Sequence, residues 1–210
     1  SPEAPCARDP PRVHCSPPLM SDTPAAPPSR LRPVLVTVSA AVVFLVLDLW
    51  SKAWAWDNLR FKPRVPVIEK WFYLDFSFNT GSAFGFLRGH DFSRPLFIAI
   101  TIATVVYMAA LVRKLPTDRL YGFFAIGSII GGALGNMHDR LFRTMPFGGE
   151  SKHGVVDFIQ IYYLQGSPAW PNFNIADVAL VIGVFLLIPY LMFHAQIPET
   201  KAESAKPAGA

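Results

Sequence analysis

Residues 34–56, VLVTVSAAVVFLVLDLWSKAWAW, determine the class of the fold. The fourteen residues before Asp48 carry no charge and are mostly apolar. A helix needs about 20 predominantly apolar residues to cross the hydrocarbon core of a bilayer. This stretch is long enough, and it predicts a first transmembrane helix.

Three further apolar stretches have a similar length, at residues 96–112, 120–137 and 175–193. Only 16% of the 210 residues are charged, whereas about 25% is typical of soluble domains. The sequence therefore predicts an all-α polytopic membrane protein with four transmembrane helices.

The two ends of the chain differ in composition from this membrane domain. Residues 1–33 hold ten of the 20 prolines and show no periodicity, which predicts a disordered N-terminal extension. Met20 is a candidate for the native start of the chain. We expect residues 34–195 to form the transmembrane domain and residues 196–210 to form a cytoplasmic tail.

The distribution of basic residues predicts the orientation. The segment RKLPTDR at 113–119 is short and basic, so the positive-inside rule places it in the cytoplasm together with both termini. Four basic residues on the predicted outer side run against this rule: Arg60, Lys62, Arg64 and Lys70.

The predicted connections between the spans differ in character. Residues 65–79 are rich in aromatic and β-branched side chains and predict a small extracytoplasmic sheet at the membrane interface. Residues 141–154 are expected to form a mobile loop. Within the third span, Gly127, Gly131 and Gly135 are spaced by four, which favours close approach of another helix.

Polar residues gather at one predicted membrane face. The ends of spans one and three and the starts of spans two and four must lie on the same side. Ionisable groups are costly inside a membrane and are therefore candidates for function. Those near this face, with the two asparagines beside them, are Asp48, Lys52, Asn79, Asn136, Asp139, Arg140, Asp157 and Asp177.

Two pairs of these residues are four apart and share a helix face. Asp48 and Lys52 can neutralise each other, and we favour that interpretation over contact with lipid head groups or support of a site. Asn136 lies one turn before Arg140, which either binds a ligand through its planar donors or extends toward the interface. We expect Asp139 to face the interface.

Asp157 and Asp177 both lie in apolar surroundings. Asn174 is well suited to cap the fourth helix, with Asp177 in its first turn. Two close carboxylates tend to share one proton, and such a pair can activate water for aspartic proteolysis. Asp48 and Asp139 are poorer candidates because Lys52 and Arg140 follow them as potential charge partners.

Several classes of function are disfavoured. The two cysteines lie in the N-terminal extension, and no HExxH motif occurs, so the sequence predicts neither a metal site nor another cofactor. Scattered basic residues argue against nucleic-acid binding. A transporter would place its polar groups near mid-membrane, a presenilin-like protease would carry a GxGD motif, and a scaffold leaves both acids unexplained.

Five motifs in order resemble the lipoprotein signal peptidase family, also called signal peptidase II or prolipoprotein signal peptidase. They are DLWSK (48–52), FNTGSAF (78–84), GGALGNMHDR (131–140), VVDF (155–158) and FNIAD (173–177). The resemblance implies four transmembrane helices, a β-cradle and a short amphipathic helix. It implies a catalytic pair at Asp157 and Asp177, supported by Asp48, Lys52, Asn79, Gly81, Asn136, Arg140, Asn174 and Ala176.

The resemblance also implies what the protein acts on. Its substrates would be diacylglyceryl prolipoproteins, cut just before the lipidated lipobox cysteine. We expect a monomer in a bacterial inner membrane, in contact with lipids, with its active site at the periplasmic face. Globomycin-type peptides would inhibit it by occupying the pair of aspartates.

Overall fold

The computed structural model describes residues 29–81, 93–147, 149–163, 167–168 and 170–194. Residues 1–28 of the expected N-terminal extension and the expected tail at 196–210 lie outside these ranges. Four helices dominate the described residues: α1 (Leu31–Asn58), α2 (Ser93–Lys114), α3 (Leu120–Phe142) and α4 (Ile175–Phe193). All four are long and apolar enough to cross a membrane, as the sequence predicts. The first begins at Leu31, within the stretch expected to be disordered.

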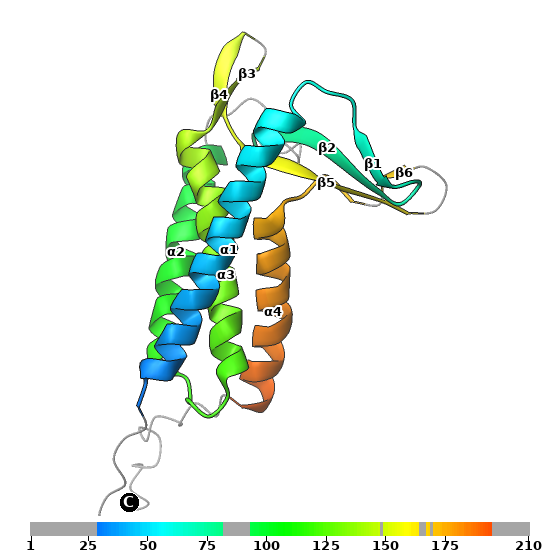
Figure 1. The fold of residues 1–210 in the computed structure, drawn as a ribbon. Coiled ribbons are helices and arrows are strands. Elements are labelled where there is room, and N and C mark those ends of the chain that lie inside the picture. The colour runs from blue at the N-terminus through cyan, green and yellow to red at the C-terminus, as the bar shows by residue number, and fades with distance from the viewer. Residues whose placement is uncertain (1–28, 82–92, 148, 164–166, 169, 195–210) are drawn as a thin grey trace, which may run out of the picture.

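The four helices run side by side as a bundle, and α3 is the most buried of them (Figure 1). Its glycines allow this packing. A Cβ on Gly131 would lie 2.6 Å from the carbonyl oxygen of Ala41 on α1, and one on Gly132 would lie 2.5 Å from that of Ala176 on α4. Side chains at these positions would push the helices apart, so the predicted close approach is confirmed.

A four-stranded antiparallel sheet covers one end of the bundle, which we call the sheet end (Figure 1). Its order is β1-β2-β5-β6, with β1 (Val65–Ile68), β2 (Phe72–Asn79), β5 (Val155–Tyr163) and β6 (Ser167–Pro168). The stretch predicted as strand thus contains two strands. A turn separates them, in which Lys70 adopts a φ of 71°.

The register of this sheet places two distant segments together. Asn79 at the end of β2 pairs with Val155 at the start of β5, and Ser77 pairs with Asp157. The sheet is fixed to the bundle by a hydrophobic cluster that joins the last turns of α1 to β5. Its buried members are Ala55, Leu59, Val156 and Phe158.

The segment between α3 and β5 differs from the sequence prediction. Instead of a mobile loop it contains an antiparallel hairpin, formed by β3 (Thr144–Phe147) and β4 (Glu150–His153), which projects from the sheet end (Figure 1). Gly149 adopts a φ of 88° beside its turn, a conformation that favours glycine. The short amphipathic helix is absent from the described residues, and residues 82–92 lie outside them.

Candidate functional site

The site begins with the predicted ion pair on α1. The ammonium group of Lys52 donates to Oδ2 of Asp48 at 2.7 Å, and both side chains are fully buried. The other carboxylate oxygen, Oδ1 of Asp48, accepts from the backbone N–H of Ala176 at 2.8 Å. The pair therefore neutralises itself within α1 and also holds the first turn of α4.

Asn136 connects this pair to the fourth helix. Its Oδ1 accepts from Lys52 at 2.8 Å, while its Nδ2 donates to Oδ1 of Asp177 at 2.9 Å. A third contact, from Nδ2 of Asn174, reaches the same Asn136 oxygen at 3.3 Å. One amide on α3 thus links side chains of α1 and α4.

Asn174 caps α4 as predicted, and it also connects the two acids of the predicted pair. Its Oδ1 accepts from the backbone N–H of Asp177 at 3.1 Å, and Oδ2 of Asp177 accepts from the Asn174 backbone at 3.2 Å. Its Nδ2 donates to Oδ1 of Asp157 at 2.6 Å. Asp157 and Asp177 are therefore both hydrogen-bonded to one buried asparagine.

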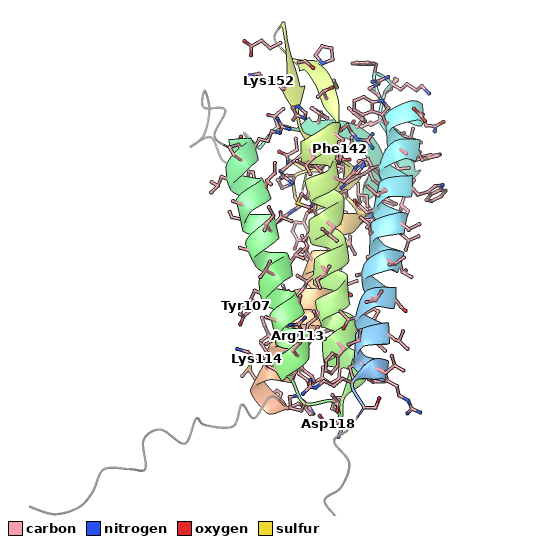
Figure 2. The ribbon with its side chains drawn as sticks, turned by 90° about the vertical axis from the view of Figure 1, so that its left-hand side faces the viewer. Tyr107, Arg113, Lys114, Asp118, Phe142 and Lys152 are labelled. Carbon is pink, nitrogen blue, oxygen red and sulfur yellow. The ribbon has the colours of Figure 1, made fainter. Side chains whose placement is uncertain are left out.

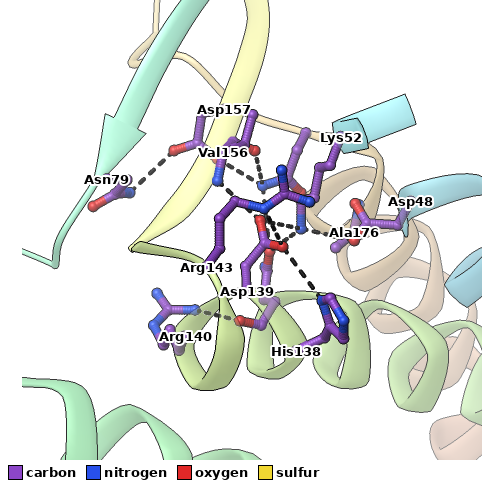
Figure 3. A network of polar contacts seen from close by, with 12 residues as sticks. Asp48, Lys52, Asn79, His138, Asp139, Arg140, Arg143, Val156, Asp157 and Ala176 are labelled. Atoms are coloured by element: carbon purple, nitrogen blue, oxygen red, sulfur yellow. Dashed lines mark hydrogen bonds and ion pairs between the residues drawn. The ribbon is translucent and has the colours of Figure 1, made fainter. Parts of the chain in front are cut away.

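Asp157 lies within β5 and is only 3% exposed. Its Oδ2 accepts from Nδ2 of Asn79 at 3.1 Å (Figure 3), a contact that follows from the register of β2 and β5. Oδ1 of Asn79 in turn accepts from the backbone N–H of Gly81 at 2.9 Å. Gly81 adopts a φ of 89°, a conformation that favours glycine, and so turns the chain back onto Asn79.

Burial, and to a smaller extent the negative charge of Asp177, together raise the pKa of Asp157 to about 7. The hydrogen bonds from Asn79 and Asn174 and the charge of Lys52 oppose this shift. Asp157 therefore changes its protonation state near neutral pH.

Arg140 closes the site on the side of α2. Its guanidinium lies 4.5 Å from the ring centroid of Phe97, and one of its nitrogens donates to the backbone oxygen of Asn136 at 3.3 Å. Its charge interacts with both Asp157 and Asp177. Arg94 at the start of α2 donates to the Arg140 carbonyl at 2.9 Å, which connects α2 to the end of α3.

The prediction for Asp139 is wrong. This residue is fully buried, and it contacts Arg143 rather than Arg140, with 3.0 Å between Nε and Oδ1 (Figure 3). Its Oδ2 accepts from the backbone N–H of Val156 at 3.0 Å and lies 3.9 Å from the ammonium of Lys52. Asp139 thus holds β5 immediately before Asp157.

Sequence reasoning missed Arg143 altogether. The only signal was its spacing of four from Asp139, which is typical of a helix ion pair. All ten predicted site residues, in contrast, lie in or directly beside this network. Within the ranges that the structure describes, no group of three or more His, Cys, Asp and Glu side chains could hold a metal ion.

The fold and the site define a class of protein: a polytopic membrane protein whose four spans carry a buried network of carboxylates and amides at one end. Two solved structures titled as bacterial membrane enzymes, determined by the in meso method, are similar to it. Each has a TM-score of 0.60, with 27% and 28% identity, covering 84% and 76% of this chain and 96% and 94% of theirs.

Comparison of the sequences gives the family. The profile described as signal peptidase (SPase) II matches residues 40–193. A lipoprotein signal peptidase of Anoxybacillus flavithermus is 38% identical over 76% of this chain and 86% of its own length. One of Geobacillus kaustophilus is 36% identical over 75% and 92%. The chain belongs to the signal peptidase II family, which is a family of peptidases, and the resemblance in its motifs is confirmed.

Proposed function

We propose that this protein removes the signal peptide from diacylglyceryl-modified prolipoproteins by an aspartic mechanism. It cuts the peptide bond just before the lipidated cysteine. Membership of the signal peptidase II family and the names of its relatives support the substrate class. The aspartic mechanism is supported by the site itself.

One contact set supports the aspartic mechanism most directly: Asn174 is hydrogen-bonded to both Asp157 and Asp177. Two acids held by one residue can share a proton, because ionising both is costly at short range. Asp157, whose pKa is raised to about 7, is suited to hold that proton. Asp177 then acts as the base.

In the proposed reaction, Asp177 takes a proton from a water molecule as the water oxygen attacks the carbonyl carbon of the scissile bond. Asp157 gives its proton to the carbonyl oxygen. When the resulting tetrahedral species collapses, the carbon–nitrogen bond breaks and the proton held by Asp177 passes to the leaving nitrogen. One hydroxyl of the tetrahedral species returns its proton to Asp157 as the carboxyl group forms, which restores both acids. The products are a new carboxyl terminus on the signal peptide and a free amine on the lipidated cysteine.

The remaining site residues take positioning roles in this proposal. Asn79, Asn136 and Asn174 donate to the carboxylate oxygens and so fix their directions. Gly81 orients Asn79. Asp48 and Lys52 hold the first turn of α4 through Ala176 and Asn136. Arg140 supplies a cation beside the pair, where it can contact a substrate carbonyl.

The proposed setting is a bacterial inner membrane, with both termini in the cytoplasm and the sheet end at the periplasmic face. The basic segment at 113–119, at the opposite end of the bundle, supports this orientation. A site near the membrane surface suits a substrate whose acyl chains stay in the bilayer. In the same proposal the protein acts as a monomer, and globomycin-type peptides inhibit it by binding at Asp157 and Asp177.

We expect the cleavage rate to fall as the pH rises through about 7, because Asp157 then loses the proton that it donates. Asn79→Ala removes a hydrogen bond that favours the ionised form. The pKa of Asp157 should then increase, and the fall in rate should move to higher pH. Rate profiles against pH check this, with Asp75→Asn on β2 as the control that keeps the wild-type profile. A fall at lower pH in Asn79→Ala would contradict it.

The test of the proposed function uses the purified chain and two forms of one prolipoprotein, with and without the diacylglyceryl group. We expect cleavage of the lipidated form alone, and the mass of the product should correspond to a chain that begins at the modified cysteine. Equal cleavage of both forms, or a cut elsewhere, would overturn the proposed substrate or cleavage site.

A further inference from the structure

The segment that follows α1 carries exposed basic and aromatic side chains that the proposed site does not use. We call residues 60–71 the interfacial segment; it comprises the turn after α1, strand β1 and the tip of the β1–β2 hairpin. Residues 61–71 are all exposed and Arg60 is half-buried, and the segment holds one acid, Glu69. Among the described residues, no ion pair involves any of its four cations, which are Arg60, Lys62, Arg64 and Lys70.

Phe61 is exposed and adopts a strained backbone conformation. Phe61 adopts a φ of 60°, in the left-handed region that a bulky residue rarely occupies, and its side chain is 84% exposed. A hydrogen bond of 3.1 Å from the N–H of Lys62 to the carbonyl of Leu59 closes the turn. The guanidinium of Arg60 lies 5.3 Å from the centroid of the Phe61 ring, and strain of this kind is typical of functional positions.

Two of the cations are held on aromatic faces. The guanidinium of Arg60 lies 4.2 Å from the ring centroid of Trp56, and that of Arg64 lies 4.8 Å from the ring of Tyr73 and donates to the hydroxyl of Tyr162. No hydrogen bond from the Arg60 side chain is present within the described residues. A guanidinium placed in this way keeps its planar donors available for a phosphate group.

The position of the segment indicates what lies against it. Helix α1 ends at Asn58, and the exposed Trp50 and Trp54 on its last turns are of the kind that marks a membrane–water interface. The sheet extends sideways beyond the end of the bundle, past α4 (Figure 1). In a membrane crossed by the four helices, these features would place the interfacial segment at headgroup depth.

We propose that the interfacial segment is a docking surface for anionic phospholipid headgroups in the leaflet next to the sheet end. Its cations bind the headgroup phosphates, while Phe61 and Trp71 enter the boundary between headgroups and acyl chains. With four cations against one acid, the segment favours anionic over neutral lipid. This inference does not depend on the proposed peptidase mechanism.

The experiment places an environment-sensitive fluorophore on Val67→Cys in β1, in the full chain with Cys6→Ser and Cys15→Ser. The protein is studied in nanodiscs of phosphatidylcholine alone, with added phosphatidylglycerol, or with added phosphatidylserine. We expect both anionic lipids to shift the emission to the blue and to protect the probe from a soluble quencher. High salt should reverse the shift because it screens the attraction. Free glycerol phosphate should not reproduce it.

The double variant Arg60→Gln with Lys62→Gln should raise the fraction of anionic lipid that produces half of the maximal blue shift in the probe's emission. A basic residue near an anionic surface strengthens the attraction by about fivefold, so loss of two predicts a large change. Lys62→Gln alone gives a smaller change and serves if the double variant does not fold. The matched control is Arg113→Gln with Lys114→Gln at the opposite end (Figure 2), which should keep the wild-type shift.

Three outcomes would overturn the proposal. The first is an equal shift in phosphatidylcholine alone, and the second is a shift with free glycerol phosphate. The third is an unchanged lipid dependence when Lys62 is replaced.

Discussion

We expect Asp157→Asn and Asp177→Asn each to reduce cleavage of the lipidated prolipoprotein by about 10²–10⁴-fold or more, the usual contribution of a general acid or base. Asparagine has nearly the same shape as aspartate, but it can neither take a proton from water nor deliver one to a leaving group. Asp157 also accepts hydrogen bonds from two asparagines, and one oxygen of the new amide can still accept. The initial rate, measured by mass spectrometry of the products, checks this expectation.

The control is Asp75→Asn, an acid on the same sheet. Within the part of the chain that the structure describes, its carboxylate accepts a single long hydrogen bond, of 3.5 Å, from Asn172. It should retain the wild-type rate. Asp157→Asn and Asp177→Asn should also unfold near the wild-type temperature in detergent. A normal unfolding temperature would show that the loss of activity does not come from a loss of structure. A rate within tenfold of wild type in either variant would remove that residue from the proposed mechanism.

Lys52→Met is expected to have the largest effect on stability, a loss of about 3–5 kcal/mol in the free energy of unfolding. Lys52 is fully buried, and its ammonium lies close to two fully buried carboxylates, those of Asp48 and Asp139. Methionine fills a similar volume without the charge, so it leaves these two acids uncompensated. Unfolding in a denaturing detergent, followed by circular dichroism, measures the loss.

Lys114→Met is the matched control. Lys114 is exposed at the last residue of α2, at the end of the bundle opposite to Lys52. Its replacement should change the free energy of unfolding by no more than about 0.5 kcal/mol. Adding Asp48→Asn to Lys52→Met removes one of the uncompensated charges and should recover part of the lost stability. If Lys52→Met costs no more than its control, the buried ion pair does not stabilise the bundle.

The transmembrane helices could be predicted because a membrane imposes a simple requirement on the sequence. A span must be long and apolar, and alternating directions then determine which helix ends meet. This reasoning alone brought Asp48, Asn136 and Asp177 to the same face, where hydrogen bonds connect them through Lys52, Asn174 and Ala176. Each of these residues needed only its place along a helix.

The environment of Asp139 could not be predicted in the same way. Its helix position suggested an outward direction, but β5 crosses the end of α3 and its Val156 N–H donates to the carboxylate. The covering strand comes from a segment seventeen residues further along the chain. The hairpin in residues 141–154 was not predicted either, because its polar and glycine-containing sequence is equally typical of a loop.

The acid on α4 and the acid on β5 depend on different kinds of structure. Asp177 lies on a helix that is long and apolar enough to cross a membrane, whereas the direction of Asp157 depends on the register of β5 against β2. A shift of one residue in that pairing would turn Asp157 to the other face of the sheet. A chain that has inserted its helices but not yet assembled its sheet therefore lacks the pair. In the proposed mechanism, cleavage would therefore require that the sheet has reached this register.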